Sequence, residues 1–277
     1  MIETRLYHPD KERGCFTKNL AGSGGAPVGE AWGLHWLEGD PWGLAHPDHD
    51  CYSSAKEVGI NSDGVMSLGV KHRPERFHGR EYPWAVGRVH SREVFKYGTF
   101  DFWFRLPTDR GLWPAIWLYD RDNWPPEIDV VEGWTQKLRR WETINNNVNP
   151  QGYRRGLLNT VKPALVYAPG DAIKNVSGGV MKRGTWWWHV NPRDLVHARL
   201  VWTPAEISVY YEGHRELHVT DAGVLNHFNF CNGMILVLNN YVQGDYNMGY
   251  YYGSCHLIRD FLIYEVRYTP MGEEVAL

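Results

Sequence analysis

The sequence lacks any apolar run of the roughly 18 residues that a transmembrane helix needs. It also lacks a long basic stretch, and its formal net charge is −3, so it offers no electrostatic footprint for a nucleic acid. Residues 1–14 contain no apolar segment typical of a secretory signal. We therefore expect no membrane or nucleic-acid partner. If a signal was removed, the protein is expected to be secreted or periplasmic; otherwise the compartment stays open.

Cysteine is scarce, and the four positions, Cys15, Cys51, Cys231 and Cys255, are far apart. They form no CxxC pair, which argues against a zinc site. Two disulfides, with three alternative connectivities, would suit an exported protein, and free thiols are an equal alternative. The thirteen histidines show no ligand spacing such as HExxH, so they give no sign of a metal site either.

Amphipathic helices of convincing length are missing, whereas short segments alternate with the period of two that is typical of strands. In residues 99–105 every second position is Phe. Residues 58–72 predict a hairpin with a turn over 61–64, and residues 197–213 predict another with its turn at Thr203 and Pro204.

Further strands are predicted at 234–242 and 255–268, and Gly- and Pro-rich turns separate them. Many short strands of this kind favour an all-β sandwich, and 277 residues suit a single domain over 1–277. Residues 1–30 are polar and Gly-rich, and we expect them to be an irregular lead-in.

Aromatic residues are abundant, with fourteen Trp and sixteen Tyr. Many of them lie beside Gly, Pro, Asn and Asp in sequence that is typical of turns. Exposed aromatic rings suit stacking on the apolar faces of sugar rings.

Residues 124–134 carry three carboxylates within six positions, Glu127, Asp129 and Glu132. The intervening residues are β-branched and favour a strand. In a regular strand Glu127 and Asp129 would share a face and Glu132 would point to the other. A β-bulge at Val130 or Val131 would return Glu132 to the face of Glu127.

With such a bulge, the two glutamate carboxyls are expected about 5 to 6 Å apart, the separation of a retaining glycosidase. The alternative is an exposed strand face whose acids are solvated, with or without a bound cation.

These residues resemble glycoside hydrolase family 16. The central pieces are GLWPAIWL and EIDVVE, the second of which fits the bulged pattern E-[IL]-D-x-x-E of laminarinases, agarases, porphyranases and carrageenases. DGVMSLGV, GRVHSREVFKYGTFDFWFRLP and HARLVWTPAEISVYYEG are similar to flanking segments of the family, so the resemblance covers residues 55–268. It implies a jelly-roll β-sandwich of two curved antiparallel sheets with an open substrate cleft. It also implies endo-acting, retaining, metal-independent hydrolysis of polysaccharides.

Carried over to this chain, the resemblance implies that Glu127 is the nucleophile, Glu132 the general acid/base and Asp129 the assisting acid between them. Physical chemistry agrees, because crowded carboxylates cannot all ionise at neutral pH and one keeps the proton that the leaving oxygen needs.

Substrate contacts are less sharply predicted than the acids. For Trp113 and Trp117 core packing is an equal alternative. For Arg88 a solvated or ion-paired side chain is the more common situation in a strand. Asparagines occupy 145–147, where many family members have a His, so the sugar on that side of the cleft stays open. The candidate substrate-binding residues are Trp113, Trp117, Trp124, Trp134, Arg88 and Asn147.

Three further positions carry weaker hypotheses. Asp260 is a weak candidate for the structural calcium site that the resemblance implies, and a surface or turn Asp is the favoured alternative. Asn239 and Asn240 could reach the cleft or cap their strand. No cofactor is expected for catalysis.

The sequence therefore predicts a monomeric, retaining endo-glycosidase with a β-linked polysaccharide as its partner. A β-1,3-glucan is the first choice of substrate, and a red-algal galactan such as agarose, porphyran or carrageenan is the alternative. Transglycosylation would need the same acids. A non-catalytic carbohydrate-binding jelly roll is the alternative from another class, and it predicts a damaged set of acids.

Overall fold

The computed structural model describes residues 26–39, 43–45, 50–107, 112–120, 122, 124–135, 159–168, 174–177, 195–242 and 259–272. At 134–135, 159–162, 175 and 177 it describes the backbone alone. The described part is almost entirely β-structure, arranged in three sheets.

The largest sheet has eight strands, all paired antiparallel to their neighbours. Its strands lie in the order β1 (Pro27–Ala31), β2 (Leu34–Glu38), β8 (Arg88–Ser91), β17 (Met234–Val242), β10 (Leu112–Asp120), β11 (Glu127–Thr135), β12 (Asn159–Tyr167) and β13 (Lys174–Ser177). The acidic segment is β11, which lies between β10 and β12. The catalytic candidates are therefore held by ladders on both sides.

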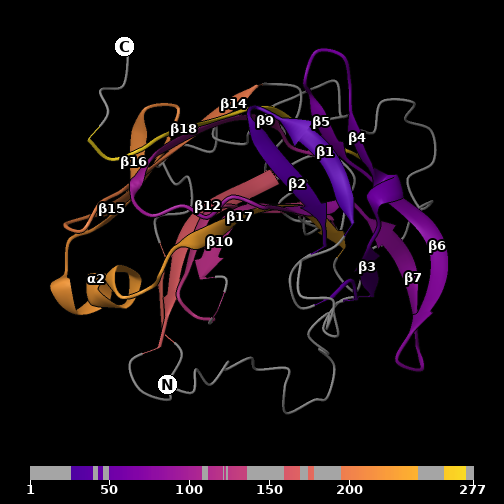
Figure 1. Ribbon diagram of the computed structural model, residues 1–277, viewed down its shortest axis with the longest axis horizontal. Coiled ribbons are helices and arrows are strands. Elements are labelled where there is room, and N and C mark those ends of the chain that lie inside the picture. The colour runs from indigo at the N-terminus through magenta and orange to yellow at the C-terminus, as the bar shows by residue number, and fades with distance from the viewer. Residues whose placement is uncertain are drawn as a thin grey trace, which may run out of the picture.

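A seven-stranded antiparallel sheet forms the second layer, with β9, β14 and β18 above β10, β12 and β17 in the view of Figure 1. Its order is β16 (His214–Val219), β15 (Ile207–Tyr211), β14 (Val196–Trp202), β9 (Gly98–Arg105), β18 (Phe261–Thr269), β5 (Met66–Leu68) and β4 (Val58–Ile60). A small third sheet joins β3 (Cys51–Ser53), β7 (Arg80–Val86) and β6 (Val70–Phe77), and β3 runs parallel to β7. The predicted two-sheet sandwich is confirmed.

The main core lies between the two large sheets. Phe100, Phe102 and Phe104 of β9 are fully buried there, as their alternation predicts, together with Ile116 and Leu118 of β10. Each such side chain contributes about 1.5–3 kcal/mol relative to an exposed one.

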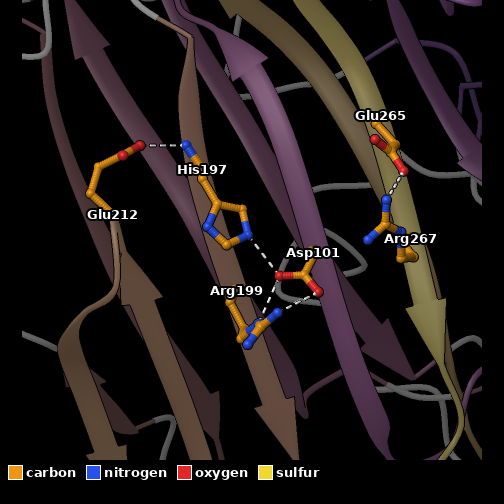
Figure 2. Close-up of polar contacts among 6 residues, drawn as sticks. All are labelled: Asp101, His197, Arg199, Glu212, Glu265 and Arg267. Atoms are coloured by element: carbon orange, nitrogen blue, oxygen red, sulfur yellow. Dashed lines mark hydrogen bonds and ion pairs between the residues drawn. The ribbon is translucent and has the colours of Figure 1, made fainter. Parts of the chain in front are cut away.

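Asp101 and Trp103 alternate with the core phenylalanines and so point to the outer face of the seven-stranded sheet. There the Asp101 carboxylate accepts hydrogen bonds from His197 and from Arg199, as Figure 2 shows. The outer face of this sheet therefore contains a buried carboxylate held by a guanidinium and an imidazole ring.

Both predicted hairpins are confirmed. Between β4 and β5, the side chain of Asn61 accepts hydrogen bonds from the backbone N–H groups of Asp63 and Val65, both at 2.9 Å. Gly64 completes this turn with φ at +76°, a value that favours glycine. Between β14 and β15, the hydroxyl of Thr203 accepts from the backbone of Ala205 and Glu206.

One expectation needs correction. Residues 27–30 belong to β1 rather than to an irregular lead-in, because β1 pairs with β2 through a tight turn. In agreement with the expected lack of long helices, α2 (Ala222–Asn229) before β17 is short, and a 3₁₀ turn, η2 (Ala55–Glu57), lies between β3 and β4. The carboxylate of Asp221 caps α2 by accepting from the N–H of Val224, a local signal that periodicity alone misses.

Two of the cysteines lie within the described residues. Cys51 and Cys231 are buried free thiols, and burial raises the pKa of Cys51 to about 12. Cys15 and Cys255 lie outside the described residues. None of the described helices is both long enough and apolar enough to cross a membrane.

Candidate active site

The register of β11 contains the bulge that the acid spacing predicts. Against β12, Asp129 pairs with Ala164 and Glu132 with Lys162, so two residues of β11 face no partner there. Against β10, the pairing moves from Asp129 directly to Val131. Val130 is thus the residue without a partner in either ladder, and the predicted bulge is confirmed.

The side chains around the bulge point the way that such an insertion requires. Val130 and Val131 are consecutive, yet both are fully buried in the core between the sheets. In a regular strand two neighbours would point to opposite faces. The extra residue on the core side therefore reverses the face to which each later side chain of β11 points.

Pairing with β10 places the three acids on one face. Glu127 lies opposite Tyr119, Asp129 opposite Trp117 and Glu132 opposite Ala115. The three β10 residues are two apart, so they and their partners share one face of the sheet, and the core-facing Ile116 and Leu118 occupy the other. The 5 to 6 Å separation of the glutamate carboxyls stays a prediction.

Glu127 is half-buried, and its carboxylate accepts a hydrogen bond of 2.7 Å from Nε1 of Trp124. Burial and, after it, the charge of Glu132 raise the pKa of Glu127 to about 7. The hydrogen bonds from Trp124 and with Asp129, and the charge of Arg88, act in the opposite direction. A proton therefore stays in this group of carboxyls up to neutral pH.

Aromatic rings continue the acid-bearing face along β10. The rings of Trp117 and Tyr119 stack, with centroids 4.9 Å apart. Nε1 of Trp117 donates to the side-chain oxygen of Asn239 at 2.7 Å, and the amide of Asn239 donates to the carbonyl of Trp113 at 3.3 Å. This network fixes the Trp117 ring two positions from Ala115, the partner of Glu132.

Arg88 enters the same face from β8. It is only 4% exposed, and its guanidinium lies 5.4 Å from the Trp117 ring and 5.1 Å from the Tyr241 ring. It also donates a hydrogen bond to the hydroxyl of Tyr241. Arg88 is thus an internal cation beside the acids, not the solvated side chain that the alternative predicted.

The structure brings together six of the predicted site residues. They share the acid-bearing face of the large sheet or lie beside it: Arg88, Trp113, Trp117, Glu127, Asp129 and Glu132. Trp124 joins them through its bond to Glu127, whereas only the backbone of Trp134 is described. Asn147 lies outside the described residues. Trp113 and Trp117 are half-buried, so both face the site while also packing on apolar neighbours.

Tyr119 and Tyr241 also belong to this site, although the sequence did not predict them. For Asn239 and Asn240 the sequence allowed either a place in the cleft or a cap on their strand. Asn239 and Tyr241 lie opposite Ala115 and Trp113, so they share the acid-bearing face. The period of two along 234–242 could have indicated this, if the neighbour of that strand had been known. Asn240 instead points away from the acids, since its amide donates to the carbonyls of Leu68 and Arg259.

Metal binding has little support in the described residues. Within the ranges given above, no group of three or more His, Cys, Asp and Glu side chains lies close enough to hold a metal ion. Asp260 lies just before β18, half-buried, and burial raises its pKa while Arg259 acts against that shift. Its assignment to a calcium site stays a prediction.

Comparison with known proteins agrees with this arrangement. Residues 45–165 match the model of glycosyl hydrolases family 16. The β-glucanase of Rhodothermus marinus is 26% identical over 238 residues, which cover 79% of this chain and 72% of that protein. The endo-1,3-1,4-β-glycanase ExsH of Rhizobium meliloti is 30% identical over 125 residues, which cover 43% of this chain but only 26% of that protein.

Solved structures share the fold. The laminarinase catalytic domain from Thermotoga maritima superimposes with a TM-score of 0.59 at 18% identity. The match covers 84% of this chain and 90% of that domain. The jelly-roll architecture is therefore common to both.

Proposed function

We propose that the chain, a glycoside hydrolase whose residues 45–165 match the model of glycosyl hydrolases family 16, is a retaining endo-glycosidase acting on β-1,3-glucan. The relatives support endo-acting cleavage of a β-glucan. The observation that carries the retaining mechanism is the bulge at Val130, which returns Glu132 to the face of Glu127 and Asp129. The choice of β-1,3-glucan is supported by the similarity to the glucan endo-1,3-β-glucosidase A1 of Niallia circulans.

In the proposed mechanism Glu132 donates its proton to the glycosidic oxygen while the carboxylate of Glu127 attacks the anomeric carbon. The bond to the leaving sugar breaks, and a covalent glycosyl-enzyme ester forms on Glu127. Glu132, now a carboxylate, takes a proton from water, and that water hydrolyses the ester. Both side chains return to their starting protonation states.

The proton of this mechanism belongs to a coupled pair. Since Glu127 and Glu132 interact, they titrate together, and the raised pKa of Glu127 describes the pair. We assign the proton to Glu132 when the bond breaks, because Trp124, Asp129 and Arg88 all favour the ionised form of Glu127. Asp129 is accordingly the assisting acid.

We propose that sugar rings stack on aromatic side chains along the same face. Trp117 lies opposite Asp129, and Trp124 binds the carboxylate of Glu127. Trp113 lies on β10 two positions before Ala115, the partner of Glu132. Arg88 would hold Trp117 and Tyr241 in place and stabilise the nucleophile. Trp134 and Asn147 remain candidates for further sugar contacts in an open cleft.

Catalysis by this pair needs no cofactor, since one carboxyl supplies the proton and the other the nucleophile. We propose that the enzyme acts as a monomer, outside the cytoplasm if a signal was removed. Structural calcium at Asp260 is part of this proposal.

The test is incubation with laminarin, lichenan, agarose, porphyran and carrageenans, followed by sizing of the products. We expect short oligosaccharides from laminarin. If laminarin gives no product and one of the galactans does, that galactan becomes the assigned substrate. Glu127→Gln is expected to lose at least about 10³-fold in kcat, in the range of nucleophile removal. An unchanged rate in this variant would remove Glu127 from the mechanism. No product from any of the five would contradict the proposed activity.

A further inference from the structure

The hydroxyl of Tyr211 lies at the catalytic bulge although the residue belongs to the opposite sheet. Tyr211 ends β15 and is only 1% exposed, within the core between the two large sheets. Its hydroxyl donates a 2.6 Å hydrogen bond to the carbonyl of Val130. This contact joins residues 81 positions apart in the chain and crosses the whole core.

The bulge creates the need for this bond. Val130 is the residue of β11 that pairs with neither β10 nor β12. Ladder carbonyls point within the plane of their sheet, so a hydroxyl from the opposite sheet reaches one only where the backbone has turned toward the core. A buried carbonyl left without a partner is costly, and Tyr211 supplies the donor.

We propose that Tyr211 is a positioning residue of the active site: it fixes the bulge of β11 and thereby the direction of Glu132 relative to Glu127 and Asp129. The inference rests on the proposed function, in which these three acids act. Without the bond the extra residue can move along the strand, and a shift by one position turns the following side chain to the other face.

The electrostatics around Tyr211 agree with a permanent donor. Burial, followed by the charges of Glu216, Glu132 and Asp129, raises the pKa of Tyr211 well above its usual value. Because the phenol keeps its proton over the whole working range, the bond to Val130 does not open with pH. The bond to Val130 places the hydroxyl at the residue that follows Asp129 and lies two positions before Glu132.

The test compares Tyr211→Phe with Tyr268→Phe. The hydroxyl of Tyr268 donates to the carbonyl of Tyr97 at 2.7 Å, in the same sheet layer but at the ladder of β9 and β18. Each variant therefore removes one hydroxyl-to-carbonyl bond and keeps the ring. For Y211F we expect kcat to fall about 10- to 100-fold with KM within about threefold, since small misplacement of a reacting group costs that much. For Y268F we expect wild-type kcat.

A Y211F enzyme with kcat within about twofold of wild type, or a loss that Y268F matches, would overturn the inference. If Y211F does not fold, 4-aminophenylalanine at position 211 keeps a weaker donor on the same ring. Its kcat is expected about two- to tenfold below the wild-type value, because a weaker bond holds the bulge less firmly. A wild-type kcat together with a wild-type titration of Glu127 would contradict the proposal.

A titration without substrate separates this inference from the proposed function. We expect the pKa of the Glu127 carboxyl, followed by carbon NMR, to fall in Y211F, because Glu132 moves away and its charge no longer raises it. Asp129, Trp124 and Arg88, the other groups that act on Glu127, are unchanged in the variant. An unchanged titration would overturn the inference even if no glucan is cleaved, whereas full activity of Glu127→Gln would overturn only the proposed function.

Discussion

Trp124 shows how one donor adjusts the acid pair. Its indole N–H binds the Glu127 carboxylate at 2.7 Å and lowers a pKa that burial raises. In Trp124→Phe this donor is lost, so the pKa of Glu127 rises further. A nucleophile must be ionised, and we therefore expect the acid limb of the kcat/KM profile to move to higher pH.

The matched control for this prediction is Trp32→Phe. Nε1 of Trp32 donates to the carbonyl of Tyr264, a bond of the same kind at 3.0 Å that does not involve the acids. Its pH profile should coincide with that of the wild type. If Trp124→Phe also left the acid limb in place, the hydrogen bond would not control the nucleophile.

At the scale of elements, strands β9 and β14 are joined on their outer face by a buried charge. Asp101 is 1% exposed and binds His197 at 2.6 Å and Arg199 at 2.7 Å (Figure 2). On the neighbouring strand β18, Glu265 and Arg267 form an ion pair whose two side chains are 41% and 54% exposed. The two sites test how burial changes the contribution of an ion pair.

Asp101→Asn should lower the free energy of unfolding by about 2–3 kcal/mol, because it leaves the Arg199 guanidinium and the His197 ring with a poorer acceptor. The full cost of a buried pair is not expected, since Arg199 keeps solvent contact. Glu265→Gln should cost about 0–1 kcal/mol, as exposed pairs do. Urea unfolding measures both, and equal losses would refute the role of burial.

A feature of these elements could be predicted where it depends on residues close together in the sequence. The bulge could be predicted because the acid spacing and the period of two are local and conflict with each other. Tyr119 could have been assigned from Trp117 by the same alternation. Tyr241, Asn239 and the bond from Tyr211 could not, since the pairing of β17 with β10 and the packing of β15 on β11 are long-range.

Across the whole molecule, the active site carries a cost in stability. The pKa of Glu127 is raised from 4.5 to about 7 in the folded state, so between these pH values the folded protein binds more protons than the unfolded chain. Stability therefore falls as pH rises through this window. Glu127 as a residue is half-buried and shares its titration with Glu132, so we expect a loss of about 1–2 kcal/mol.

Glu127→Gln removes that titration and keeps an oxygen acceptor for Trp124. Its free energy of unfolding should exceed the wild-type value by about 1–2 kcal/mol at pH 8 and match it near pH 4. Chemical unfolding at both pH values measures the difference. A variant that is no more stable than wild type at pH 8 would show that Glu127 titrates normally in the folded protein.

The central claim is that the bulge at Val130 sets Glu127 and Glu132 as a close, retaining pair on one face of the large sheet. Proton NMR of the first products from laminarin tests it most directly, because the anomeric configuration is read before mutarotation. A retaining pair predicts that the β-anomer forms first. If the α-anomer forms first, the carboxyls are wide enough apart to admit water between them, and the proposed pairing is wrong.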